Sequence, residues 1–167
     1  MKHFLFLLWQ FTWGLPQNLI GLVAFLALRK KYEHKAFCQA VVTYIPTEKP
    51  FGGVSLGMFI FLNPTPAHHN QDWVYDAHIH EYGHTIQTMI LGWLFLPVIG
   101  LPSFVWCNLK PIIKWRAKTG HSYYWLYTEG WANHLGRRAS KLQFKEKEML
   151  LRGNYDKPFK DAQEALN

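Results

Sequence analysis

An uncharged stretch at residues 4–28, FLFLLWQFTWGLPQNLIGLVAFLAL, constrains the fold of this chain more than any other feature. A helix needs about 20 apolar residues to cross the hydrocarbon core of a membrane, so this stretch is long enough. Basic residues, which favour the cytoplasmic side of a membrane, follow it at Arg29, Lys30, Lys31 and Lys35. We therefore expect an N-terminal transmembrane helix whose C-terminal end faces the cytoplasm.

Two details of this stretch leave alternatives open. Lys2 and the first apolar residues resemble a signal peptide, but the run is longer than usual and has no clear small-x-small cleavage site. The sequence GLPQN at residues 14–18 interrupts the run, and proline disrupts helical hydrogen bonding, so a kinked span and a helical hairpin both fit. We expect a membrane segment with its basic flank at residues 1–35, and the rest of a single domain at residues 36–167.

The composition is typical of a protein that contacts a lipid membrane. Of the 167 residues, 49% are hydrophobic and eight are tryptophan, and the formal net charge is +7. Anionic head groups account for basic clusters at residues 29–35, 110–118 and 137–147, whereas no nucleic-acid-binding motif is present. We expect membrane lipid as a partner and no nucleic acid. Cys38 and Cys107 lie among apolar residues without metal-site spacing, which predicts two buried, reduced thiols.

The remaining sequence predicts an α+β fold. β-branched and aromatic residues at 39–45 and 54–62, separated by a turn-rich stretch, predict two strands of an antiparallel hairpin. Helical patterns are expected over residues 76–95 and 122–147. Asp72 or Asp76 is expected to cap the first of these helices.

That first helix contains His80-Glu81-Tyr82-Gly83-His84, which fits the pattern H-E-x-x-H. Residues i and i+4 share one helix face, so His80 and His84 can present two imidazole nitrogens to one ion. Glu81 is placed beside the metal to act as a general base on an activated water. Two histidines are only half of a tetrahedral zinc shell, so a third protein ligand is required.

We expect the third ligand downstream, where the candidates are His121, Glu129, His134, Asp156 and Asp161. Glu129 is favoured because it lies in the helical pattern YTEGWAN. The small residues Gly130 and Ala132 there, and Gly83 in the first helix, would let the two helices approach closely. Asn133 lies four residues after Glu129, on the same face, and is expected to hydrogen-bond a ligand histidine.

These motifs resemble a known group. HEYGH followed by EGWAN is similar to the H-E-x-x-H and E-x-x-x-D motifs of the gluzincin metallopeptidases. The chain also resembles small bacterial membrane proteins in which an H-E-x-G-H helix runs into the sequence LPVIGLPS. The resemblance implies a zincin-like fold with zinc (Zn²⁺) held by His80, His84 and Glu129, and Glu81 as the base. Asn133 stands where the gluzincin pattern has Asp, so the hydrogen-bonding group is kept and its charge is lost.

An oxyanion-stabilising group is also expected near the metal. His121 is the first candidate, because it lies eight residues before Glu129 and close to the same helical side. The alternatives are Tyr123, Tyr124 and Tyr127. His78 lies on another helix face from the two motif histidines, and we expect it at the surface or hydrogen-bonded to a ligand.

The metal site also limits the topology of a second uncharged stretch, residues 85–108. A full crossing of the membrane there would place His84 and Glu129 on opposite sides, where they cannot share an ion. We therefore expect this stretch to turn back at LPVIGLPS, as a re-entrant or buried helical hairpin. The metal site then lies on the cytoplasmic side of the cell membrane.

The sequence thus predicts a membrane-associated zinc-dependent hydrolase, in the first place a metallopeptidase with a peptide or protein substrate. Residues 54–61 are the expected edge strand for an extended substrate. The alternatives are a zinc hydrolase of a lipid or of a small-molecule amide or ester, an intramembrane protease, and a non-enzymatic membrane protein with a structural or absent metal. A fourth protein ligand, such as His78 or His121, would favour a structural metal.

Overall fold

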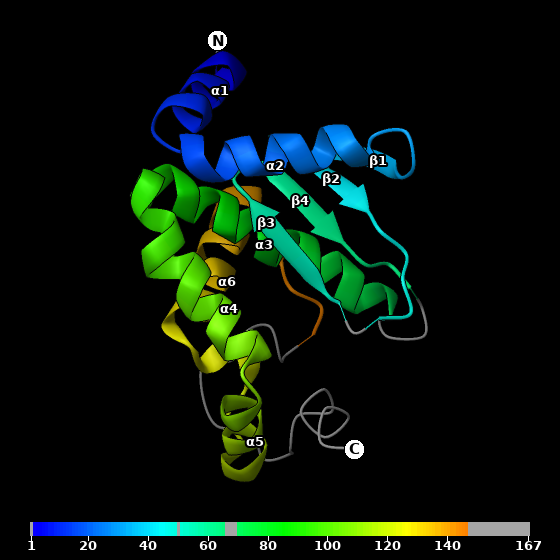
Figure 1. Cartoon of the computed structure of the whole chain (residues 1–167), viewed down its shortest axis with the longest axis vertical. Helices are drawn as coiled ribbons and strands as arrows, with labels where there is room; N and C mark the ends of the chain where they lie inside the picture. Colours follow the sequence, from blue (N-terminus) through cyan, green and yellow to red (C-terminus); the bar gives the residue numbers. More distant parts are fainter. Residues whose placement is uncertain (1, 50, 66–69, 147–167) are drawn as a thin grey trace.

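The computed structural model describes residues 2–49, 51–65 and 70–146, which form an α+β fold (Figure 1). Its mixed sheet has the strand order β1-β2-β4-β3. The strands are β1 (Glu33–Phe37), β2 (Ala40–Tyr44), β3 (Gly53–Leu56) and β4 (Phe59–Leu62). The α+β class expected from the sequence is therefore confirmed.

The expected hairpin between residues 39–45 and 54–62 is wrong, because β2 and β4 pair in parallel. The second run is itself a hairpin of β3 and β4, which reverses at Gly57, where φ is +68°. Glycine adopts this backbone conformation without steric cost. The Oγ atoms of Ser55 and Thr85 donate hydrogen bonds to the Gly57 carbonyl oxygen and so hold the turn.

Helices cover both faces of the sheet. On one face, Val42, Ile60 and Leu62 pack against α3 (Gln71–Leu91). On the other face, Phe59 and Phe61 pack against α1 (Lys2–Thr12) and α2 (Leu15–Leu28). All four residues of β4 are buried as a result, which explains why its sequence shows no alternation of polar and apolar residues.

The N-terminal apolar stretch is two helices and not the single transmembrane helix that we expected. No single helix among the described residues is long and apolar enough to cross a membrane; residues 3–12 and 15–28 meet the length and composition only as a pair, bent by 104°. Asn18 stabilises the break, because its Nδ2 donates to the carbonyl oxygens of Gln10 and Gly14 at 3.0 and 2.7 Å. Its Oδ1 accepts the backbone N–H of Met58, which ties the break to the sheet.

Helix α3 begins earlier than expected. Its N-cap is Asn70, whose side chain accepts the N–H of Trp73, and not Asp72 or Asp76. Asp76 instead accepts the backbone N–H groups of Lys145 and Glu146, each at 2.8 Å. This carboxylate therefore joins the segment after the last described helix to α3.

The second uncharged stretch is broken, as expected, but the break precedes LPVIGLPS. Helix α3 ends at Leu91 and is followed by Gly92, where φ is +57°; residues 71–94 and 96–108 are bent by 119°. The sequence LPVIG forms a π-helix that runs into α4 (Leu101–Asn108). The next helix, α5 (Lys110–Thr119), was not expected, and the helix expected at 122–147 is shorter, because α6 spans Tyr127–Ser140.

The two cysteines form no disulfide, as expected, but the expectation that they are buried is wrong. Cys38 is exposed in the β1–β2 turn, and Cys107 is exposed on α4. Of their apolar neighbours in sequence, Trp106 is buried and Phe37 packs against the core, but this does not extend to the cysteines themselves.

Candidate metal centre

The side chains of His80 and His84 on α3 meet that of Glu129 on α6. All three are buried, and their ligand atoms lie within 4.8 Å of one another. Glu129 Oε2 is 3.2 Å from His80 Nε2 and 3.5 Å from His84 Nε2. The structure thus brings together the three residues that the sequence proposes as ligands.

Two glycines allow the helices to approach closely enough for this group to form. A Cβ atom on Gly83 would lie 1.9 Å from the carbonyl oxygen of Ala132, and a Cβ on Gly136 would lie 1.9 Å from that of Ile79. The expected roles of Gly83 and Ala132 are confirmed. The expected role of Gly130 is wrong, because Gly136 is the glycine of α6 that contacts α3.

Side-chain amides fix the tautomers of both histidines. Asn133 Oδ1 lies 2.7 Å from His80 Nδ1, and Gln87 Oε1 lies 2.7 Å from His84 Nδ1. An amide oxygen only accepts hydrogen bonds, so each Nδ1 carries the proton and each Nε2 is left with a lone pair directed at Glu129. The role of Asn133 was expected. That of Gln87 was missed, although a polar residue three positions after His84 was a signal.

A further set of hydrogen bonds positions the carboxylate of Glu129. Gln87 Nε2 donates to the carbonyl oxygen of Thr128 at 2.8 Å, and Thr128 Oγ1 donates to Glu129 Oε1 at 3.0 Å. Ser103 Oγ on α4 donates in turn to Thr128 Oγ1. Because Oε1 is occupied in this way, Oε2 is the oxygen that faces the two imidazoles.

This geometry fits a metal ion. Glu129 Oε2 is buried and accepts no hydrogen bond, while two imidazole lone pairs point toward it. Ligands about 2.05 Å from zinc in a tetrahedral shell are about 3.3 Å apart, which lies between the two distances seen here. Burial opposes the ionisation of Glu129, but protonation of the two imidazoles, in place of a bound metal ion, outweighs it and holds the pKa of Glu129 well below its usual range. A carboxylate in this state is ready to bind a cation.

Glu81 lies next to this group. Burial raises the pKa of Glu81 to about 7; the neighbouring His80 lowers it and the charge of Glu129 raises it. Its Oε2 is buried and has no hydrogen-bond partner. A Cβ on Gly53, at the start of β3, would lie 2.7 Å from Glu81 Oε1. The carboxylate therefore lies beside the edge strand of the sheet.

Among the expected oxyanion groups, the structure favours Tyr123 over His121. His121 Nδ1 is hydrogen-bonded to Thr119 Oγ1, and its ring stacks on that of Trp115. His121 does not belong to the ligand group. The ring of Tyr123 is 6.5 Å from that of His80. Burial, and the nearby charges of Glu129 and other groups, raise the pKa of Tyr123 well above its ordinary value, so its hydroxyl stays protonated.

The other expected candidates lie elsewhere. His78 faces the sheet, where its Nε2 accepts from the hydroxyl of Tyr44 on β2, while its Nδ1 donates to the carbonyl oxygen of Val74 within α3. Tyr124 packs its ring against His80 at 5.4 Å, so it is adjacent to the site as a packing residue. Asp156 and Asp161 lie outside the described residues. In the described part of the chain, the ligand group therefore has three members and no fourth.

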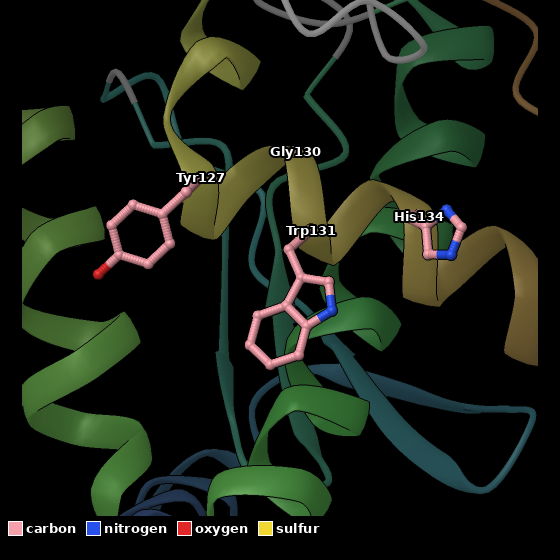
Figure 2. A pocket seen from close by; sticks show the side chains of 4 residues that line it. All are labelled: Tyr127, Gly130, Trp131 and His134. Atoms are coloured by element: carbon pink, nitrogen blue, oxygen red, sulfur yellow. The ribbon is translucent and has the colours of Figure 1, made fainter.

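A shallow hollow on the outer side of α6 is separate from this site (Figure 2). Tyr127, Gly130, Trp131 and His134 line it. These residues recur at intervals of three and four, on the helix face opposite Glu129 and Asn133. Neither His134 nor Tyr127 reaches the ligands, and Tyr127 instead donates a hydrogen bond to the carbonyl oxygen of Val98.

Comparison with known proteins assigns no family. No protein-family model, curated protein or solved structure matches the chain. The likeness to gluzincin metallopeptidases therefore rests on the motif residues alone.

Proposed function

We propose that this protein is a membrane-associated, zinc-dependent hydrolase, and specifically a metallopeptidase. The observation that carries the proposal is the convergence of two imidazole lone pairs and one carboxylate oxygen, at 3.2 and 3.5 Å, beside the buried Glu81. Three protein ligands leave one position of a tetrahedral ion open, as in catalytic zinc sites. The choice of zinc rests on the H-E-x-x-H spacing of His80 and His84 together with a glutamate as the third ligand, which is a ligand set of catalytic zinc sites.

Each nearby side chain has a role in such a hydrolysis. Bound zinc would lower the pKa of a water molecule and polarise the substrate carbonyl. Glu81 would accept a proton from the water and pass it to the leaving amine. The protonated hydroxyl of Tyr123 would donate a hydrogen bond to the oxyanion. Asn133 and Gln87 would keep the two histidines in the ligating tautomer.

The sheet supports a peptide as the substrate. Strand β3 is at the edge of the sheet, and its first residue, Gly53, lies beside Glu81. An extended peptide can pair with such an edge through backbone hydrogen bonds. The expected edge strand at residues 54–61 is corrected here, because β4 is an interior strand; of the two edge strands, β1 and β3, it is β3 that lies beside Glu81.

The membrane part of the proposal rests on exposed apolar side chains. Large hydrophobic residues are exposed on α1, α2, the end of α3 and α4, including Phe4, Trp9, Ile20, Val23, Trp93, Leu101 and Phe104. Soluble surfaces rarely gather so many. The same surface also favours a second candidate, a zinc hydrolase of a lipid amide or ester, which assays with lipid substrates would separate from a peptidase. The cytoplasmic orientation of the site stays a prediction.

Three proteins test the proposal: the wild type, Glu129→Ala and Glu81→Gln, with Glu33→Gln as a control at an exposed glutamate of β1. Elemental analysis of detergent-purified protein should find zinc in the wild type, Glu81→Gln and Glu33→Gln, and little in Glu129→Ala. Cleavage of a fluorogenic peptide library should be lost in Glu129→Ala and Glu81→Gln only. Folded wild-type protein without metal, or a fully active Glu81→Gln variant, would contradict the proposal.

A further inference from the structure

Helix α5 carries a stripe of unpaired lysines. Lys110, Lys114 and Lys118 are four residues apart, so they share one face, and all three are exposed. Within residues 2–49, 51–65 and 70–146, no carboxylate forms an ion pair with any of them. Like charges at this spacing repel one another and destabilise the helix. An anionic partner outside the chain would offset this repulsion.

The other side of α5 is held in place, so the lysines face outward. Arg116 is buried, and its guanidinium lies over the rings of Trp106 and Tyr123, 5.2 and 5.4 Å from their centres. Cation–π contacts of this kind fix the rotation of the helix against α4 and the segment before α6. The lysine stripe is therefore presented as a fixed surface.

Exposed tryptophans flank this stripe. Trp115 and Trp125 are 42% and 40% exposed, and the ring of His121 lies 4.7 Å from each of them. Indole rings favour the boundary between hydrocarbon and water, because they are apolar with one polar N–H. Two half-exposed indoles held together at one place are typical of a membrane interface.

The preceding helix exposes large apolar residues. Leu101 and Phe104 of α4 are 60% and 65% exposed, and Leu109 at its end is 48% exposed. Helix α5 extends from this end of α4 and lies at the opposite end of the molecule from α1 (Figure 1). From α4 to α5 the surface thus changes from apolar to cationic, with Trp115 between Lys114 and Lys118. A lipid monolayer with anionic head groups likewise changes from an apolar acyl region to a charged surface.

We propose that α4 and α5 dock on an anionic bilayer surface: Leu101 and Phe104 enter the acyl region, the indoles lie at the interface, and the lysines bind the head groups. This surface is a membrane contact additional to α1 and α2, and it does not depend on the metal site. A polyanion such as RNA would satisfy the lysines but would leave the apolar side chains of α4 in water, which is why the bilayer is favoured.

The two cysteines provide an internal test. Cys107 is exposed on α4, three residues after Phe104, and Cys38 is exposed in the β1–β2 turn on the sheet. Full-length protein would be diluted from detergent into vesicles of phosphatidylcholine, with or without phosphatidylserine, and labelled with a water-soluble maleimide. Mass spectrometry of the peptides would give the labelling rate of each thiol. We expect anionic vesicles to protect Cys107 strongly and to leave Cys38 unchanged.

A charge-matched pair of variants then tests the lysines. Replacement of Lys110, Lys114 and Lys118 by Gln should lower the partition coefficient for anionic vesicles by roughly 100-fold, about fivefold for each lysine. It should also abolish the protection of Cys107. As the charge-matched control, Lys49→Gln, which removes one charge at an exposed residue outside the basic clusters, should bind nearly as well as the wild type, whereas Lys114→Gln alone should bind about fivefold more weakly. All of these variants should keep the zinc content of the wild type, so a failure here is distinct from a failure of the metal proposal.

Three outcomes would overturn the inference. One is equal labelling of Cys107 with and without anionic vesicles. Another is equal loss of binding in Lys49→Gln and Lys114→Gln, which would show that net charge matters and the stripe does not. The third is tight binding of a single-stranded oligonucleotide that depends on the same lysines and prevents vesicle binding, which would assign the stripe to nucleic acid.

Discussion

Replacement of Gly83 by Ala should disable the metal centre without touching a ligand. The added Cβ would lie 1.9 Å from the Ala132 carbonyl oxygen, whereas ordinary contact begins at 3.4 Å, so α3 and α6 must separate by about 1.5 Å. The three atoms nearest to the added Cβ are all backbone atoms of Ala132, so no flexible side chain can absorb the change. Overpacking of this kind costs about 1–3 kcal/mol of folding free energy.

The effect on metal binding should be larger than the effect on stability. Metal sites tolerate errors of only about 0.2 Å in ligand distance. A separation of the helices would move Glu129 Oε2 from its 3.2 and 3.5 Å positions beyond the reach of an ion held by both histidines. Losing one of three ligands in this way should weaken zinc binding by at least 100-fold, of the order seen when even outer hydrogen-bond partners are lost.

The assay is a zinc titration in competition with a chromophoric chelator, together with thermal unfolding followed by circular dichroism in zinc-free buffer. Gly100→Ala is the matched control, because a Cβ there meets its nearest atoms at an ordinary 3.6–3.9 Å and the backbone is already helical. That variant should bind zinc normally and be as stable as the wild type or slightly more stable. Wild-type zinc affinity in a folded Gly83→Ala protein would refute the argument from helix spacing.

Three further predictions concern the surroundings of the site. Zinc binding should weaken about 10–100-fold in Gln87→Met and in Asn133→Ala, because each loses the amide that orients a ligand histidine. Asn133→Asp, which keeps an accepting oxygen, should bind zinc at least as tightly as the wild type. If Gln87→Met and Asn133→Ala bound zinc as tightly as the wild type in the chelator titration, the tautomer argument would be contradicted. Removal of zinc should lower the midpoint of thermal unfolding, because zinc at 100 times its Kd adds about 2.7 kcal/mol of stability, and the Glu129→Ala protein should show no such shift. Asp76→Ala should lower the free energy of unfolding in urea by about 3 kcal/mol, because two hydrogen bonds to a carboxylate are lost. It should also speed the hydrogen exchange of the backbone N–H groups of Lys145 and Glu146. Unchanged exchange rates would show that these two hydrogen bonds contribute little.

The ligand set was predictable because its geometry is local. The spacing of His80 and His84 on a helix is set by the helical repeat, which the sequence contains in full. Glu129 and Asn133 followed from the same repeat applied to a second helix. Gly83 and Ala132 signalled that the two helices could approach closely, and the structure confirms this contact.

Predictions that depended on distant contacts were less successful. The parallel pairing of β2 with β4 could not be foreseen, because the turn at Gly57 is stabilised by Thr85, which is remote in sequence. The bend after α1 depends on hydrogen bonds from Asn18 and on the contact of Asn18 with Met58. His121 was assigned to the site from a helix that begins only at residue 127, so the assumed helical spacing did not apply.

The sequence by itself determined which side chains can bind a metal, because a helix places residues i and i+4 on one side whatever surrounds it. Only the tertiary structure decided which nitrogen of each histidine faces the site, since Gln87 and Asn133 set this through hydrogen bonds. It also decided that Tyr123 and not His121 lies near the ligands, and that the first apolar stretch bends by 104°. Those outcomes depend on contacts between segments that are far apart in the chain. The energies of such contacts cannot be read from a local sequence pattern.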